Sequence, residues 1–151
     1  MRLLIGILKY AWASPATSLG YVLGLLGLLT GGSVARHGAV LEFSGGFVKW
    51  FMNQFPNKTI LAMTLGYAIV GKEKWGLDAA RDHELVHVRQ YGLWGVFFLP
   101  AYTVSSIIEW FRGNDPYMNN IFEREAYAEA PIKPVKRPSK DAADDAGEHA
   151  S

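Results

Sequence analysis

The chain has 151 residues, which is enough for one domain with a modest core. Apolar residues make up 50% of it and charged residues only 19%, less than the usual quarter of a soluble domain, so the composition indicates a membrane-associated or unusually apolar protein. A net charge of +1, without a basic face in which aromatic residues are interspersed, argues against a nucleic-acid partner. There is no cysteine, which excludes disulfides and thiolate metal sites.

Residues 1–35 form a hydrophobic segment that we predict to be a membrane helix. No charged residue occurs in residues 10–35, and this stretch is longer than the roughly 20 residues that cross a bilayer. Pro15 is expected in the first turn of the helix. A signal peptide, a buried helix and an interfacial helix fit the same stretch. The prediction is therefore membrane association through residues 10–35, with the side of the membrane left open.

Residues 36–75 have the pattern of a small antiparallel sheet of two or three strands. Residues 39–43 read as a short strand, and residues 47–55 as either a strand or a short amphipathic helix. Residues 59–70 are rich in β-branched and aromatic side chains and read as a further strand, with Gly66 at a bulge. We expect this sheet to pack against the helix that follows it.

That helix carries the most informative motif of the chain, His83-Glu84-Leu85-Val86-His87. Asp78 is a suitable N-cap, and the helix is expected to end at Gly92. Residues four apart share one helix face, so both imidazoles can bind one metal ion. Glu84 lies beside them and can act as a general base toward a metal-activated water without being a ligand.

A third ligand is expected from the second half of the chain, because a catalytic zinc usually has three protein ligands and one open position. No other histidine is suitably placed, so the third ligand must be a carboxylate. Glu123, on a helix predicted at residues 119–130, is the first choice, and Glu125 is its rival on the same helix. Glu123 also fits a capping box with Asn120, in which its carboxylate would bind only the N-cap amide.

Two further segments complete the predicted organisation. Residues 91–108 are again free of charge and contain Pro100, which fits either a hairpin that dips into a membrane or an apolar wall beside the site. Residues 131–151 are rich in proline and then in charged and small residues, which predicts a disordered tail. The domain with the site is thus expected to span residues 36–130.

The two-part pattern, His-Glu-Leu-Val-His followed by Phe122-Glu123-Arg124-Glu125-Ala126-Tyr127, resembles the gluzincin metallopeptidases. It is most similar to membrane gluzincins of the HtpX and CAAX-prenyl-protease kind and to the small minigluzincin domains. The resemblance implies that Glu123 is the third zinc ligand. The aspartate that orients a zinc-bound histidine in those proteins is Tyr127 here, so Asp82 or a backbone carbonyl would have to replace it.

The order of features over residues 8–127 also resembles a group of small uncharacterised bacterial proteins, and this likeness implies no particular substrate. Taken together, the sequence predicts an α+β fold in which a small antiparallel sheet packs on a zinc-site helix pair, behind an N-terminal membrane helix. The predicted function is that of a zinc-dependent metallopeptidase with a peptide or protein substrate. The alternative is a non-catalytic membrane-associated protein with a structural or vestigial zinc site. Two histidines and a carboxylate also suit iron or manganese.

Overall fold

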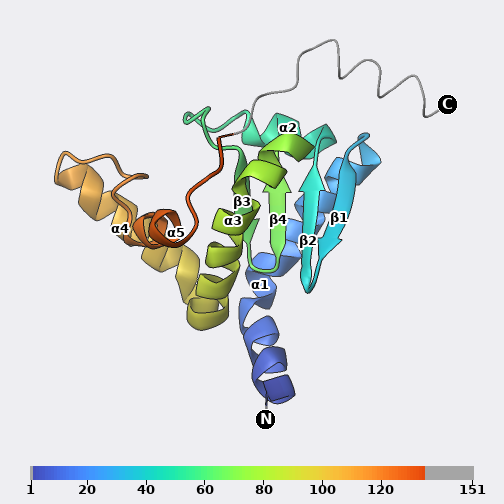
Figure 1. Ribbon diagram of the computed structural model, residues 1–151, viewed down its shortest axis with the longest axis horizontal. Helices are drawn as coiled ribbons and strands as arrows, with labels where there is room; N and C mark the ends of the chain where they lie inside the picture. The colour runs from blue at the N-terminus through green and yellow to red at the C-terminus, as the bar shows by residue number, and fades with distance from the viewer. Residues whose placement is uncertain (1, 135–151) are drawn as a thin grey trace.

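The computed structural model describes residues 2–134, with side chains from residue 6 onward, and has an α+β fold (Figure 1). Its elements in chain order are α1 (Arg2–Leu29), β1 (Ser33–His37), β2 (Val40–Ser44), α2 (Gly46–Met52), β3 (Ala62–Leu65), β4 (Ala68–Gly71), α3 (Lys74–Trp94), the 3-10 turn η1 (Gly95–Phe97), α4 (Phe98–Phe111) and α5 (Ile121–Glu129). The expected apolar N-terminal helix, the sheet and the two later helices are all present.

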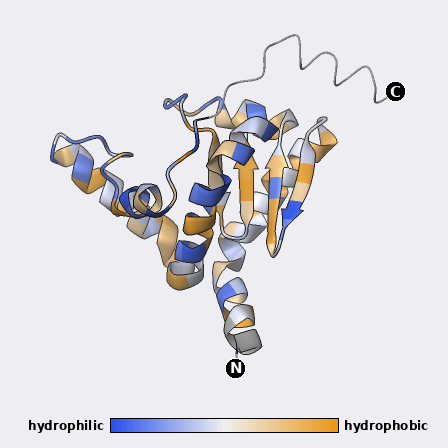
Figure 2. Ribbon diagram, viewed as in Figure 1, coloured by the Kyte–Doolittle hydropathy of each residue, from blue (hydrophilic) through white to orange (hydrophobic). Residues whose placement is uncertain are grey.

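The sheet is mixed, which corrects the prediction of a purely antiparallel one. Its strand order is β1-β2-β4-β3. The pairs β1–β2 and β3–β4 are antiparallel hairpins, whereas β2 and β4 run parallel to each other. Strand β4 is hydrophobic and buried along its whole length (Figure 2), so it takes a central place. Strand β1 is exposed throughout and lies at one edge.

Residues 59–70 form a hairpin rather than one strand with a bulge. Gly66 has φ +63° and lies in the turn between β3 and β4. The turn packs tightly on α1, because a Cβ at Gly66 would lie 2.1 Å from Oγ1 of Thr17. Two other local predictions are also corrected: residues 47–55 contain helix α2, and β1 begins inside the predicted membrane segment at Ser33.

Helix α1 covers one face of the sheet and α3 packs on the other (Figure 1). Close approach to the sheet depends on two glycines of α1. A Cβ at Gly20 would lie 2.5 Å from Cβ of Ala68, and one at Gly24 would lie 2.4 Å from the Phe43 ring. Two layers of helix around a small sheet bury its apolar side chains on both faces.

Pro15 lies inside α1 and not in its first turn, because the helix begins 13 residues earlier than expected, at Arg2. A proline has no N–H to donate to the carbonyl four residues before it, here that of Ala11. The hydroxyl of Ser14 donates to this carbonyl at 2.7 Å instead. A local side-chain hydrogen bond therefore makes the internal proline tolerable.

Helix α3 is longer than predicted at both ends. It starts at Lys74 with Glu73 as N-cap, so Asp78 lies within it, and it ends at Trp94 instead of Gly92. Gly95 follows with φ +53°, and a Cβ there would lie 2.0 Å from the indole of Trp12. The chain then continues through η1 into α4, so residues 91–108 are not a hairpin but form the end of α3 and a separate helix.

Within the residues that the structure describes, two stretches are long and apolar enough to cross a membrane, namely Gly6–Leu29 and Lys74–Phe111. The criterion is one of length and composition alone, and buried helices of soluble proteins and signal sequences meet it too. At the other end of the chain, the first residues of the expected tail contact α3: the N–H of Lys133 donates to the Ala79 carbonyl at 3.2 Å. Residues 135–151 of that predicted tail lie outside the described residues.

Candidate metal centre

Three buried side chains, His83 and His87 on α3 and Glu123 on α5, bring their ligand atoms within 4.8 Å of one another. Nε2 of His83 lies 3.1 Å from one carboxylate oxygen of Glu123, and Nε2 of His87 lies 3.4 Å from the other. In a tetrahedral zinc site with bonds of 2.0–2.1 Å, ligand atoms are about 3.3 Å apart. The donor set and its spacing therefore suit a metal ion such as zinc.

The Nδ1 atoms of the two histidines, which lie away from Glu123, each contact an oxygen atom. Nδ1 of His83 lies 3.3 Å from the carbonyl of Ala130, and Nδ1 of His87 lies 2.8 Å from Oε1 of Gln90. These acceptors place a proton on each Nδ1 and so leave each Nε2 as the atom that can bind a metal. The backbone carbonyl of Ala130, and not Asp82, therefore contacts the His83 ring. The side chain of Asp82 instead pairs with Lys133 at 2.6 Å.

The side chain of Gln90 is fully buried and joins α3 to α5. Its Nε2 donates to the carbonyl of Phe122 at 3.1 Å and to Glu125 at 3.0 Å. Glu125 also pairs with Arg89, and Arg89 binds Glu129 in addition. Glu125 thus faces the α3–α5 contact, and Glu123 is the carboxylate that lies with the histidines.

Helix α5 is held in place by its N-cap, Asn120, which is fully buried. Its side-chain oxygen accepts from the N–H of Phe122, and its amide nitrogen donates to the Tyr102 carbonyl at 2.9 Å and to Ser106 at 2.8 Å. The capping-box interpretation of Glu123 is wrong: its carboxylate accepts from the Tyr102 hydroxyl at 2.7 Å and faces the histidines.

A buried glutamate completes the cluster. Glu84 accepts a hydrogen bond from the Thr64 hydroxyl of β3 at 2.7 Å. Burial raises the pKa of Glu84 above its usual range, while the charge of His87, the hydrogen bond from Thr64 and the charge of His83 oppose this. A carboxylate with a raised pKa next to a metal site has the properties of a general base.

The electrostatics of the metal-free cluster favour a cation between the ligands. Burial lowers the pKa of His87, but its hydrogen bond with Glu123 and the charges of Glu84 and Glu123 outweigh this and raise it to about 9. Burial raises the pKa of Glu123, yet hydrogen bonds with His83 and His87 outweigh this and hold it at about 2. Without metal, a proton on His87 therefore balances Glu123, and a divalent cation would replace that proton.

A cavity of about 380 Å³ opens beside the cluster. Strand β3 forms one wall of it, the inward face of α4 forms another, and Glu84, His87 and Glu123 lie in its lining. Residues 91–108 thus contribute an apolar wall beside the site, which is one of the two structures that the sequence predicted for them. Strand β3 pairs only with β4 within the described residues, so its outer edge, beside the cavity, has no strand partner there.

Tyr91 contributes the one buried side-chain polar atom that has no hydrogen-bond partner among the described residues, its hydroxyl. The side chain is fully buried and lines the cavity. Burial, and next to it the charge of Glu84, raises the pKa of Tyr91, so its hydroxyl stays protonated and can donate. A buried donor without a partner at a cavity is a candidate contact for a ligand.

Three further aromatic or imidazole side chains differ in how they lie relative to the site. Tyr117 lines the cavity, whereas the Tyr127 ring packs on His83 with ring centres 4.5 Å apart, at the position of the expected aspartate. His37 lies 3.4 Å from Glu42 and outside the cluster. The contact of Thr64 with Glu84 could not be predicted from the sequence, because nothing in the local pattern marks a hydrogen bond between residues 20 apart.

Comparisons of the chain with models of known protein families, with curated proteins and with solved structures find no match. The assignment of a function therefore depends on the residues of the site.

Proposed function

We propose that the protein is a zinc-dependent metallopeptidase of the gluzincin type. The observation that carries this proposal is the buried cluster of His83, His87 and Glu123 next to Glu84, at the wall of an open cavity. A purely structural metal site has its coordination closed by protein ligands. Here three ligands, a buried base and an adjoining cavity favour catalysis over the alternative of a structural or vestigial site.

Each residue of the cluster has a distinct role in this proposal. His83, His87 and Glu123 hold the zinc ion, which when bound lowers the pKa of a water molecule and polarises a substrate carbonyl. Glu84 accepts the proton of the attacking water and then transfers it to the leaving amine. The hydrogen bond from Thr64 holds one carboxylate oxygen of Glu84 in place during these transfers.

The hydroxyl of Tyr91 is assigned to the developing oxyanion. A preorganised donor that gains its partner only in the transition state contributes directly to the rate. Tyr102 is less suited to this role, because its hydroxyl already donates to Glu123 at 2.7 Å. Tyr91 therefore acts as a hydrogen-bond donor, and Tyr102 positions a ligand.

A peptide is the proposed substrate because an extended backbone can pair with the outer edge of β3. Such strand addition supplies main-chain hydrogen bonds independent of sequence, and pockets for side chains supply the specificity. The cavity lining includes Phe55, Ile60 and Leu99, which suit an apolar side chain of the substrate. Membrane association, as predicted from the composition, would bring such apolar segments near the site.

The test measures metal content and hydrolysis in the same set of purified variants. Wild type is expected to hold about one zinc per chain, and Glu123→Ala and His87→Ala are expected to lose it. Glu125→Ala is the matched control on the same helix and keeps its zinc. Glu84→Gln keeps zinc but loses hydrolysis of a fluorogenic peptide library rich in apolar residues.

Two results would overturn the proposal. The first is the absence of bound metal in wild type even after zinc is supplied, which removes the catalytic centre. The second is a Glu84→Gln variant that hydrolyses peptides as fast as wild type, which removes the general base. Zinc that stays bound in a wild type without any hydrolysis would support the structural site instead.

A further inference from the structure

Helix α4 has its polarity inverted relative to a helix that borders water. Its buried residues include Ser105 and Glu109. Ser105 accepts the N–H of Ile121, and Glu109 accepts from Arg112 and Asn114. The exposed positions are instead large and apolar: Leu99, Val104, Ile107, Ile108, Trp110 and Phe111. In water, the apolar stripe of an amphipathic helix faces the protein core. The outward apolar stripe of α4 therefore indicates that something other than water covers this side of the helix.

Helix α1 shows the same inversion in the size of its side chains. Most of its buried positions are small, namely Ala13, Thr17, Gly20, Gly24 and Gly27, and Leu23 is the one large aliphatic side chain buried beside them among the described residues. Its outward positions carry Leu19, Val22, Leu25, Leu26 and Leu29, which are all exposed. Most of the large aliphatic side chains on residues 15–29 of this helix therefore point away from the protein.

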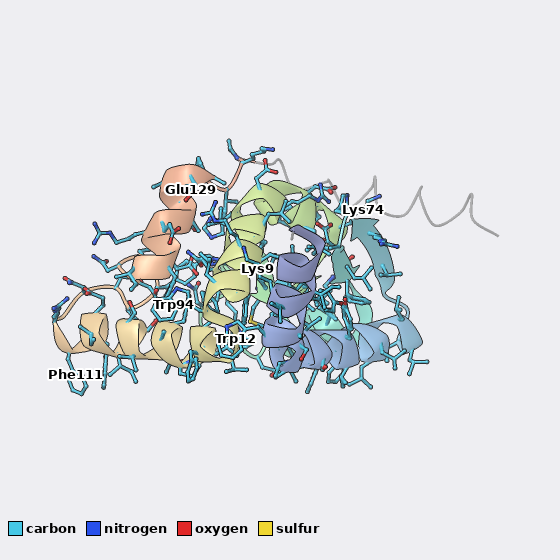
Figure 3. All side chains as sticks on the ribbon, turned by 90° about the horizontal axis from the view of Figure 1, so that it is seen from below. Lys9, Trp12, Lys74, Trp94, Phe111 and Glu129 are labelled. Atoms are coloured by element: carbon cyan, nitrogen blue, oxygen red, sulfur yellow. The ribbon has the colours of Figure 1, made fainter. Side chains whose placement is uncertain are left out.

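The two outward faces lie on one side of the molecule. Figure 3 shows α4 and the second half of α1, residues 15–29, following each other along the lower side of the view, with Trp12 and Phe111 at that side. Lys74 and Glu129 lie on the opposite side. Trp12 connects the two faces, because its ring packs on Phe97 with centres 5.8 Å apart. We call the combined surface of residues 15–29 and 98–111 the apolar face.

The chemistry of the apolar face fits lipid better than a protein partner. Among the exposed positions of the apolar face, the polar side chains are Ser18 and Thr103 and the indole of Trp110. A protein interface carries about one hydrogen bond per 100–200 Å², and this surface offers few polar groups to form them, whereas acyl chains require none. Contiguous apolar patches of this extent are typical of membrane contacts, and exposed tryptophans are enriched where lipid meets water.

We propose that the apolar face holds the protein on one leaflet of a lipid bilayer, with α1 and α4 lying flat and neither helix crossing it. Crossing would pull α1 off the sheet and expose Phe43, Ala68 and Val48, which pack beneath its glycines. A flat orientation keeps that core intact and leaves Lys74 and Glu129 in water. The inference stands independently of the proposed enzymatic activity, since neither helix face includes a metal ligand.

Binding is tested by flotation with vesicles of phosphatidylcholine, with and without phosphatidylglycerol. Leu25→Glu on α1 and Val104→Glu on α4 alter the apolar face, and Ile121→Glu on α5 is the control; the three wild-type side chains are 56%, 55% and 57% exposed. Each face variant is expected to weaken vesicle binding at least about tenfold, or about 1.4 kcal/mol. The control binds as wild type does. If both face variants bound vesicles as tightly as the control does, the proposal would be overturned.

Orientation is tested by depth measurements, for which the absence of cysteine from the chain is an advantage. Single cysteines at Leu19, Leu29, Val104 and, as control, Ile121 carry a fluorophore that brominated lipids quench according to depth. A flat α1 gives Leu19 and Leu29 equal depths, whereas a crossing α1 separates them by about 15 Å at 1.5 Å per residue. Equal depths with quenching at Val104 but not at Ile121 support the proposal.

Three outcomes would contradict it. Unequal depths at the two α1 positions would show a membrane-crossing helix. Quenching in α1 without quenching at Val104 would show that α4 takes no part. Failure of wild type to bind vesicles, combined with a dimer in sedimentation experiments that Leu25→Glu dissociates, would assign the apolar face to a second copy of the chain.

Discussion

Gln90 offers the sharpest test of how the cluster is held in place. Its side chain has two separable tasks: Oε1 accepts from Nδ1 of His87 at 2.8 Å, and Nε2 donates to the carbonyl of Phe122 and to Glu125. The first contact orients a metal ligand, and the second joins α3 to α5. Gln90→Met keeps the volume of the buried side chain and removes both contacts, so zinc affinity and stability should fall together.

The magnitudes follow from the groups that lose a partner. In Gln90→Met, Nδ1–H of His87 becomes buried without a hydrogen bond, at roughly 1–3 kcal/mol, whereas the carbonyl of Phe122 still accepts a hydrogen bond within helix α5. The unfolding free energy of the metal-free protein should therefore fall by about 1–3 kcal/mol. Loss of a group that orients a metal-bound histidine typically lowers metal affinity about 10–100-fold.

Two further variants separate the tasks. Gln90→Glu keeps an acceptor for His87 but cannot donate to Phe122 when ionised, so it should keep most of the zinc affinity and lose stability. Glu125→Ala leaves the His87 contact untouched and should bind zinc within about twofold of wild type. Affinity is measured by competition with a chromophoric chelator, and stability by urea unfolding. A folded Gln90→Met variant that binds zinc as tightly as wild type would refute this account of the ligand's orientation.

Three other predictions address packing, catalysis and pH. Gly24→Ala should destabilise the protein by about 1–3 kcal/mol in urea unfolding, because the new Cβ would lie 2.4 Å from the Phe43 ring, whereas Gly6→Ala, with nothing within 4 Å, should be neutral or stabilising. An equal loss in both would contradict the packing argument. Tyr91→Phe should lower kcat about 10²–10³-fold with little change in KM and no loss of zinc; unchanged kcat would remove Tyr91 from the mechanism. In the metal-free protein the pKa of His87 is raised to about 9, so its protonated form contributes stability in full below about pH 6.5, and this is lost as pH rises through 9. Chelator-treated protein should therefore unfold at lower urea at pH 9 than at pH 6.5, and a flat profile over that range would be inconsistent with the His87 contact.

Much of the site could be predicted because it is encoded in local spacing. Histidines four residues apart on a helix must share a face, whatever surrounds them, so His83 and His87 could be paired from the sequence alone. The sequence predicted a helix over residues 119–130 with Asn120 as a suitable N-cap, and the structure confirms Asn120 as the N-cap of α5. The charge-free residues of the first segment likewise predicted an apolar helix, which is present as α1.

The choice between Glu123 and Glu125 was decided by tertiary structure. The two residues lie on the same short helix, and their roles depend on how that helix is rotated against α3. This rotation is set by contacts between residues 32–40 positions apart, such as Gln90 with Phe122 and Arg89 with Glu129. Local periodicity cannot encode a contact at that separation, because many helix orientations satisfy the same pattern.

The sheet illustrates the same limit. The sequence by itself determined that residues 36–75 contain strands, because their composition suits a half-buried pleated surface. The parallel pairing of β2 with β4, and the turn at Gly66, depend on which strands bury both faces and on how closely α1 approaches. Composition likewise determined that residues 10–35 are apolar, but only packing on the sheet decided which side chains of α1 point outward. Short-range chemistry thus specified most of the elements and the pairing of the two histidines, whereas long-range packing specified the carboxylate that lies with them, the cavity and the apolar face.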